Sequence, residues 1–185
     1  LNHNNGSEGN VFNIVNTSTS DIVITGFTQG PSNGSAGTFD IQAYYTAGDF
    51  TNAINQASLW TQVATSTPVV LSAPNSGTAT GNFAITPVTI PAGATYGFYV
   101  GLLNGNVGYT NGTGTPGVST WASDGNITIT EGRGGSFPGF PYSPRNWNGI
   151  VHYNLVTANT SSCDSVATLN LTVTNTSGCM DPLAC

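Results

Sequence analysis

The chain has 185 residues, with two arginines, no lysine and eight acidic residues, so its formal net charge is −6. A chain with so few cations can neutralise few phosphates, which argues against nucleic acids and anionic membrane surfaces as partners. Roughly half of the residues are Gly, Asn, Ser or Thr, and no apolar run approaches the ~20 residues that span a bilayer. The apolar residues occur in short runs of β-branched and aromatic type, which predicts an ordered all-β protein.

The first half of the chain predicts short strands separated by turns. Residues 1–10 are polar and are interpreted as a lead-in, while residues 11–16 and 21–27 predict a hairpin. Residues 38–46 alternate, which places Phe39 and Ile41 on one face of a strand. Further features are expected as one helical turn within 49–56 and strands at 58–64 (carrying Trp60), 69–72 and 83–85.

The second half predicts the central strand of the fold. Residues 88–90 end at Pro91, and the chain re-enters as 96–103, YGFYVGLL, the best candidate for a buried strand. Additional strands are expected at 107–110, 127–130 and 150–153. Many short strands with Gly, Pro and Asn turns predict an antiparallel β-sandwich, jelly-roll-like in type, for residues 1–154.

Residues 155–185 are expected to form an extension of this domain. Residues 155–162 resemble a linker in composition, and residues 166–174 alternate like a strand. Because an isolated strand is not stable in water, this segment is expected to pair with its own sandwich or with the edge of a neighbouring copy. The predicted assembly residues are its main apolar side chains, Val166, Leu169, Leu171 and Val173.

The three cysteines all lie late in the chain. Cys179 and Cys185 close a short loop, which predicts a local disulfide. An extended run over residues 165–174 covers about 30 Å, so Cys163 does not easily reach Cys179. Three alternatives remain for Cys163: an intermolecular bond, a partner beyond residue 185, or a free thiol. We expect an extracellular, oxidising setting. Since Leu1 is not an initiator Met, we also expect a removed leader or a longer parent protein.

Residues 133–149, RGGSFPGFPYSPRNWNG, combine both arginines with four aromatic residues and three prolines. Aromatic faces beside a guanidinium suit a carbohydrate ring or a planar carboxylate. The alternative is a rigid lid whose aromatics cap the sandwich and whose arginines bond loop carbonyls. The candidate ligand-binding residues are Arg133, Phe140, Tyr142, Arg145 and Trp147.

Catalytic and metal-binding patterns are weak. No motif places a nucleophile beside His3 or His152, and the acids are scattered singly, so we expect no enzyme and no cofactor. Zinc would need clustered His and Cys residues. The stretch 124–126, DGN, and the pair Asp49 and Asn52 offer oxygen ligands without the spacing of a known calcium loop. A structural calcium ion is therefore an alternative to ordinary turn formation there.

The C-terminal residues resemble a known family. Residues 163–173, CDSVATLNLTV, resemble the C-D-S-x-x-x-L-x-L-T-V joints of very large secreted surface proteins of Bacteroidota. Residues 178–185, GCMDPLAC, resemble the G-C-x-D-P-x-A-C start of another repeat in those proteins, which there continues with Asn-Tyr and further cysteines. The main domain is also similar to a secreted bacterial module at 95–99, 109–112 and 144–149. The resemblance implies type IX secretion and adhesion or appendage building, with no catalytic residues.

These observations lead to one expected function and two alternatives. We expect a non-catalytic structural or adhesive module at the cell surface, joined to neighbouring copies by strand pairing. The alternative is a carbohydrate-binding module that uses residues 133–149 to hold glycans. A viral spike or fibre with a jelly-roll fold is a third class, and the lack of a basic arm argues against a nucleic-acid capsid.

Overall fold

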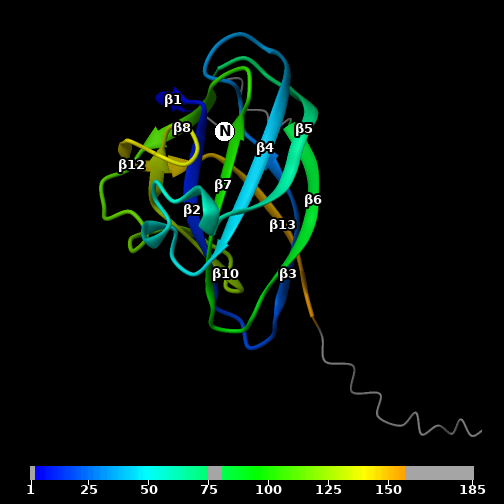
Figure 1. Cartoon of the computed structure of the whole chain (residues 1–185), viewed down its shortest axis with the longest axis vertical. Helices are drawn as coiled ribbons and strands as arrows, with labels where there is room; N and C mark the ends of the chain where they lie inside the picture. The colour runs from blue at the N-terminus through cyan, green and yellow to red at the C-terminus, as the bar shows by residue number, and fades with distance from the viewer. Residues whose placement is uncertain (1–2, 75–80, 157–185) are drawn as a thin grey trace, which may run out of the picture.

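The computed structural model describes residues 3–74 and 81–156, and this part of the chain is all-β (Figure 1). Two short 3₁₀ turns, η1 (Phe50–Asn52) and η2 (Ala57–Leu59), interrupt the strands. In chain order the strands are β1 (Asn5–Ser7), β2 (Gly9–Asn16), β3 (Ile22–Gln29), β4 (Gly37–Ala47), β5 (Thr61–Leu71), β6 (Gly81–Ile90), β7 (Thr95–Leu102), β8 (Val107–Asn111), β9 (Thr120–Ser123), β10 (Ile127–Thr130), β11 (Gly132–Gly134), β12 (Tyr142–Trp147) and β13 (Gly149–Leu155).

The strands form two antiparallel sheets packed as a sandwich, which confirms the predicted fold class. The large sheet has ten strands in the order β1-β8-β12-β11-β2-β7-β4-β5, with β10 also pairing with β2, and β9 pairing with β10. The small sheet has the order β13-β3-β6. Figure 1 shows β3 and β13 behind β4 and β7. The two sheets therefore present one face each to a shared core.

The main core lies between the sheets and is rich in aromatic rings. Phe12 stacks on Trp147 with ring centroids 4.6 Å apart, and Phe27 from the small sheet meets Trp147 edge-on at 5.7 Å. Phe98 on β7 adds a further edge contact with Phe27 at 5.7 Å. Each ring is fully or almost fully buried, and burial of such a side chain stabilises the fold by about 2–3 kcal/mol. These rings join the sheets at the centre of the sandwich.

The central-strand prediction is confirmed. Strand β7 pairs with β2 on one side and β4 on the other, and six consecutive residues, 97–102, are buried. Leu103 follows the strand and is 53% exposed. On β4, Ile41 is buried and Phe39 is partly buried against the same core, as the alternation predicted. The helical turn expected within 49–56 is η1, capped by Asp49.

The predicted hairpin of residues 11–16 and 21–27 is wrong. Strand β2 pairs with β7, β10 and β11 in the large sheet, whereas β3 pairs with β6 and β13 in the small sheet. The turn between them carries the chain from one sheet to the other. Each strand is completed by partners from later in the sequence, which a local pattern does not reveal.

The interpretation of residues 1–10 as a lead-in is also wrong, because they contain β1 and the start of β2. Asn10, Asn13 and Asn16 are fully buried on β2, although asparagine is typical of turns. Their side chains form hydrogen bonds with backbone groups. Asn16 Nδ2, for example, donates to the carbonyls of Ser20 and Ile90, each at 2.9 Å. Hydrogen bonding of this kind lets polar side chains occupy a buried strand.

Candidate functional site

The segment 133–149 is not a single loop. Gly132–Gly134 is strand β11, which pairs with β2 and β12, and Tyr142–Trp147 is strand β12, which also pairs with β8. Residues 135–141 form the connection between these strands. Because two parts of the segment are built into the large sheet, its side chains are distributed over different surfaces.

Two of the five candidate ligand-binding residues are core residues, which corrects the sequence-based assignment. Trp147 is 2% exposed, and its indole N–H donates to Gln29 Oε1 at 2.8 Å. Phe140 is fully buried in a second aromatic cluster on the other face of the large sheet, beside Tyr99 at 5.2 Å between ring centroids. A buried ring has no free face for a sugar to stack on, so neither residue serves as a glycan contact in this structure.

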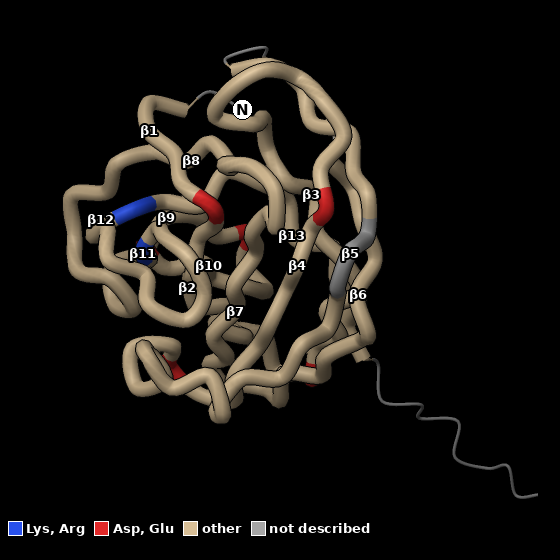
Figure 2. Tube along the Cα trace, turned by 45° about the horizontal axis from the view of Figure 1, so that its top comes forward, with Lys and Arg blue, Asp and Glu red and all other residues tan. Residues whose placement is uncertain are grey.

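The two arginines lie on neighbouring strands, β11 and β12, whereas the acidic residues are spread over the molecule (Figure 2). The Arg145 guanidinium lies 5.6 Å above the ring of Tyr109, a main-core residue, and its Nη1 donates to the Pro144 carbonyl at 2.7 Å. Arg133 pairs in register with Val11, a member of the second cluster. The two guanidinium groups are thus associated with opposite faces of the sheet.

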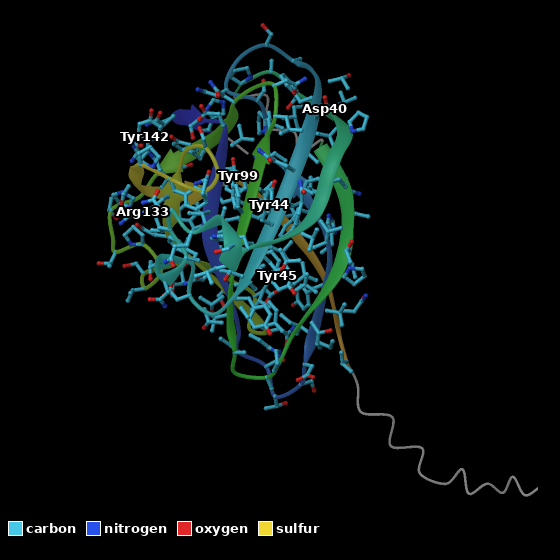
Figure 3. The ribbon with its side chains drawn as sticks, viewed as in Figure 1. Asp40, Tyr44, Tyr45, Tyr99, Arg133 and Tyr142 are labelled. Carbon is cyan, nitrogen blue, oxygen red and sulfur yellow. The ribbon has the colours of Figure 1, made fainter. Side chains whose placement is uncertain are left out.

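The second aromatic cluster lies on the outer face of the large sheet, where Figure 3 shows Tyr44 close to Tyr99. Tyr44 and Phe137 stack at 4.0 Å and are partly buried, and the Tyr99 hydroxyl donates to the Gly135 carbonyl at 3.4 Å. Burial, followed by the negative charge of Glu8, raises the pKa of Tyr99 well above its ordinary value. Tyr99 therefore acts here as a neutral hydrogen-bond donor that fixes the 135–141 connection.

The remaining chemical candidates are held by local hydrogen bonds. His152 on β13 has its Nε2 2.7 Å from Thr28 Oγ1. Asp49 accepts from the Thr51 amide at 2.8 Å as the cap of η1, and so acts as a turn-former. Within residues 3–74 and 81–156, no three His, Cys, Asp or Glu side chains are grouped to hold a metal ion. The assembly residues Val166, Leu169, Leu171 and Val173 and the cysteines 163, 179 and 185 lie outside the described residues.

No model of a known protein family matches this sequence, and a search of curated proteins returns no relative. No helix in the described ranges is long and apolar enough to cross a membrane.

One side of the sandwich is open between β13 of the small sheet and the β9–β10 hairpin of the large sheet. A hollow of about 200 Å³ lies there, and we call it the β13 groove. Its lining is largely apolar and carries one carboxylate. The lining residues are Ala122, Ser123, Asp124, Ile127, Ile129, Ile150 and Val151.

One side-chain hydrogen bond joins the walls of the β13 groove, and a second connects β9 with β12 of the same sheet. The Tyr153 hydroxyl on β13 donates to Asp124 Oδ2 at 2.7 Å, and the Trp121 indole N–H donates to the Trp147 carbonyl at 3.1 Å. The Tyr153–Asp124 hydrogen bond therefore connects β13 to the β9–β10 hairpin.

The Asp124–Tyr153 bridge has a defined protonation state. Partial burial by itself would raise the pKa of Asp124, but hydrogen bonds from the Ile127 amide, the Tyr153 hydroxyl and the Asn126 amide lower it below its usual value. Burial, followed by the hydrogen bond to Asp124, raises the pKa of Tyr153. The bridge thus consists of a carboxylate and a neutral phenol around neutral pH.

Sequence reasoning missed strand β9 and with it one wall of the groove. A signal was present, because Asp124-Gly125 stands between the runs 120–123 and 127–130, and Asp-Gly between two β-like runs is typical of a hairpin. The other wall, β13, agrees closely with the predicted strand at 150–153.

Proposed function

We propose that this chain is a non-catalytic structural or adhesive module of an extracellular surface protein or appendage, joined to its neighbours by β-strand pairing. The observation that carries the proposal is the position of β13. It is the last described strand, it pairs only with β3 among the described residues, and the chain continues from its end into a segment with a strand-like pattern. A strand edge offers a row of backbone donors and acceptors to an added strand.

Composition supports the same proposal. The sequence has few charged groups, and its surface is solvated largely by hydroxyl and amide side chains. A fold stabilised by apolar rings and neutral hydrogen bonds depends little on ionic strength, which suits a protein exposed outside the cell. The resemblance of residues 163–185 to the joints of secreted surface proteins agrees with a role in connecting modules, and its cysteines suit an oxidising environment.

The proposal is tested by the native mass of the full chain and of a chain that ends at Val156, measured by light scattering over a range of concentrations. We expect the full chain to form assemblies and the shortened chain to remain a folded monomer. Shortening at Val156 keeps the hydrogen bond from its amide to the Asp21 carbonyl, 2.8 Å, which fixes the end of β13. A full chain that stays monomeric at every concentration would contradict the proposal.

A glycan-binding surface is the second candidate, and the exposure of Tyr142 favours it. Tyr142 is 48% exposed. Tyr142, Arg133 and Arg145 are the three candidate ligand-binding residues that are not buried in this structure. The test is binding to a panel of immobilised glycans by the wild type and Tyr142→Ala. Binding that is lost in Tyr142→Ala without a change in thermal midpoint would support this candidate, and no binding by the wild type would reject it.

A further inference from the structure

We propose that the free edge of β13, together with the β13 groove, is the acceptor for residues 166–173 of a neighbouring copy. This inference rests on the proposed function and identifies where and with which segment the copies join.

Strand β13 is the least protected edge among the described strands. The edge strand β5 contains Pro68, β6 contains Pro87, β1 has three residues and β9 has four. Strand β13 has seven residues, GIVHYNL, with no proline and no Lys, Arg, Asp or Glu. Proline, charge and short length are the usual features that prevent an edge from accepting another strand. Their absence along β13 leaves this edge able to pair.

The hydrogen-bond pattern shows which backbone groups β13 offers. The Gly30 amide donates to the Asn148 carbonyl at 2.8 Å, and the Val156 amide donates to the Asp21 carbonyl at 2.8 Å. In an antiparallel pair, alternate residues direct both backbone groups toward the partner strand. The even-numbered residues of β13 therefore face β3, and the N–H and C=O groups of Val151, Tyr153 and Leu155 face the open side.

The groove beside this edge matches the side chains of the proposed donor. Ile150 is 48% exposed and lines the groove with Ile127 and Ile129. In the donor segment, Leu169, Leu171 and Val173 alternate with Asn170 and Thr172, and residues 166–174 carry no charge. An added strand would place one set of alternate side chains over the groove and the other toward water. The apolar set fits the groove, and the polar set suits the outer face.

The chain length beyond β13 allows the donor to reach another copy. Nine residues, 157–165, separate Val156 from Val166, and a chain of this length spans at most about 30 Å when fully extended. That distance is close to the diameter of a domain of this size. Return of the donor to its own β13 edge is the competing arrangement, and the experiment below separates the two.

The experiment uses two full-length variants that each lack one half of the contact. Leu169→Asp/Leu171→Asp disables the donor and keeps the acceptor, while Ile150→Glu places a charge in the groove and keeps the donor. We expect each variant alone to be monomeric, and an equimolar mixture to form a complex of twice the monomer mass. Leu103→Glu is the matched control. The exposed fraction of Leu103, 53%, is similar to the 48% of Ile150, and Leu103 does not line the groove.

Folding is checked by the near-ultraviolet circular dichroism of the buried tryptophans. If Ile150→Glu fails to fold, Ala122→Glu replaces it, since Ala122 is exposed on the opposite wall of the groove. If a folded Ile150→Glu or Ala122→Glu variant assembles to the same extent as Leu103→Glu, the acceptor assignment is overturned and the proposed function stands. A wild type that stays monomeric, and whose thermal midpoint falls in the donor variant, would show return to the same chain and would overturn both the inference and the proposed joining of copies. A wild type that never assembles and is unaffected by the donor substitutions would contradict the proposed function itself.

Discussion

Trp147 and Gln29 connect the two sheets through a single buried hydrogen bond. Trp147 ends β12 in the large sheet, Gln29 ends β3 in the small sheet, and the indole N–H lies 2.8 Å from the Gln29 Oε1. Trp147 is 2% exposed and Gln29 is fully buried. A buried amide oxygen is costly to leave without a donor, so this pair constrains how the sheets meet.

We predict that Trp147→Phe lowers the free energy of unfolding by about 1–3 kcal/mol, because the Gln29 oxygen then stays buried without its donor. Trp147→Ala is expected to cost about 3–5 kcal/mol, since it also leaves a cavity beside Phe12. Equilibrium denaturation in urea measures both values. Tyr142→Phe, at an exposed residue of the same strand, is the control and is expected to change the value by less than about 0.5 kcal/mol. An equally small effect of Trp147→Ala would show that Trp147 is not a core residue.

A second prediction concerns the acid dependence of the Asp124–Tyr153 bridge. The pKa of Asp124 in the folded protein lies below its ordinary value, so the carboxylate stabilises the fold above the unfolded pKa and this contribution disappears as the pH falls through the folded pKa. Asp124→Asn should therefore be less stable than the wild type at pH 7, and the difference should vanish in strong acid. Denaturation midpoints at a series of pH values and constant ionic strength test this.

The partner of that bridge provides the control. Tyr153→Phe removes the hydroxyl donor but keeps the ring, so it should reduce the acid dependence only in part, because the Ile127 and Asn126 amides still bond to Asp124. If the stability difference between Asp124→Asn and the wild type is the same at all pH values, the carboxylate charge does not stabilise the fold as described.

A third prediction follows from the close approach of β11 to β2. A Cβ added at Gly132 would overlap the Val11 backbone carbonyl, and a backbone atom within a paired strand has little freedom to move. Gly132→Ala should destabilise the fold by about 1–3 kcal/mol. Gly34→Ala is the matched control, because nothing lies within 4 Å of its added Cβ. Similar denaturation midpoints for the two variants would contradict this packing.

The parts of the fold that were predictable are those with a clear period and strong apolar character. Strand β7 is buried on both faces and appears in the sequence as a continuous apolar run, and β4 alternates. The beginning of β2 was missed because Gly9 and Asn10 have the composition of a turn, while in the fold Asn10 is fully buried and its amide donates to the Arg133 carbonyl. Only tertiary partners make such residues suitable for a strand.

The candidate site was harder to predict for a similar reason. The glycines and prolines of residues 133–149 are typical of a loop, yet β11 and β12 form there because β2 and β8 offer them edges. Trp147 became a candidate contact by residue type alone, and its burial depends on Phe12 and Phe27, which are distant in sequence. The β13 groove needed knowledge of which strands lie at edges, which follows from topology and not from local pattern.

The most direct test of the account is residue-resolved amide hydrogen exchange on β13, in the full chain and in Leu169→Asp/Leu171→Asp under the same conditions. We predict that the amides of Val151 and Leu155, which face the open side, are protected in the wild type and exchange rapidly in the variant. The amides of His152 and Asn154, which face β3, should be equally protected in both and serve as internal controls. Equal, rapid exchange of Val151 and Leu155 in both proteins would contradict the claim that this edge receives an added strand.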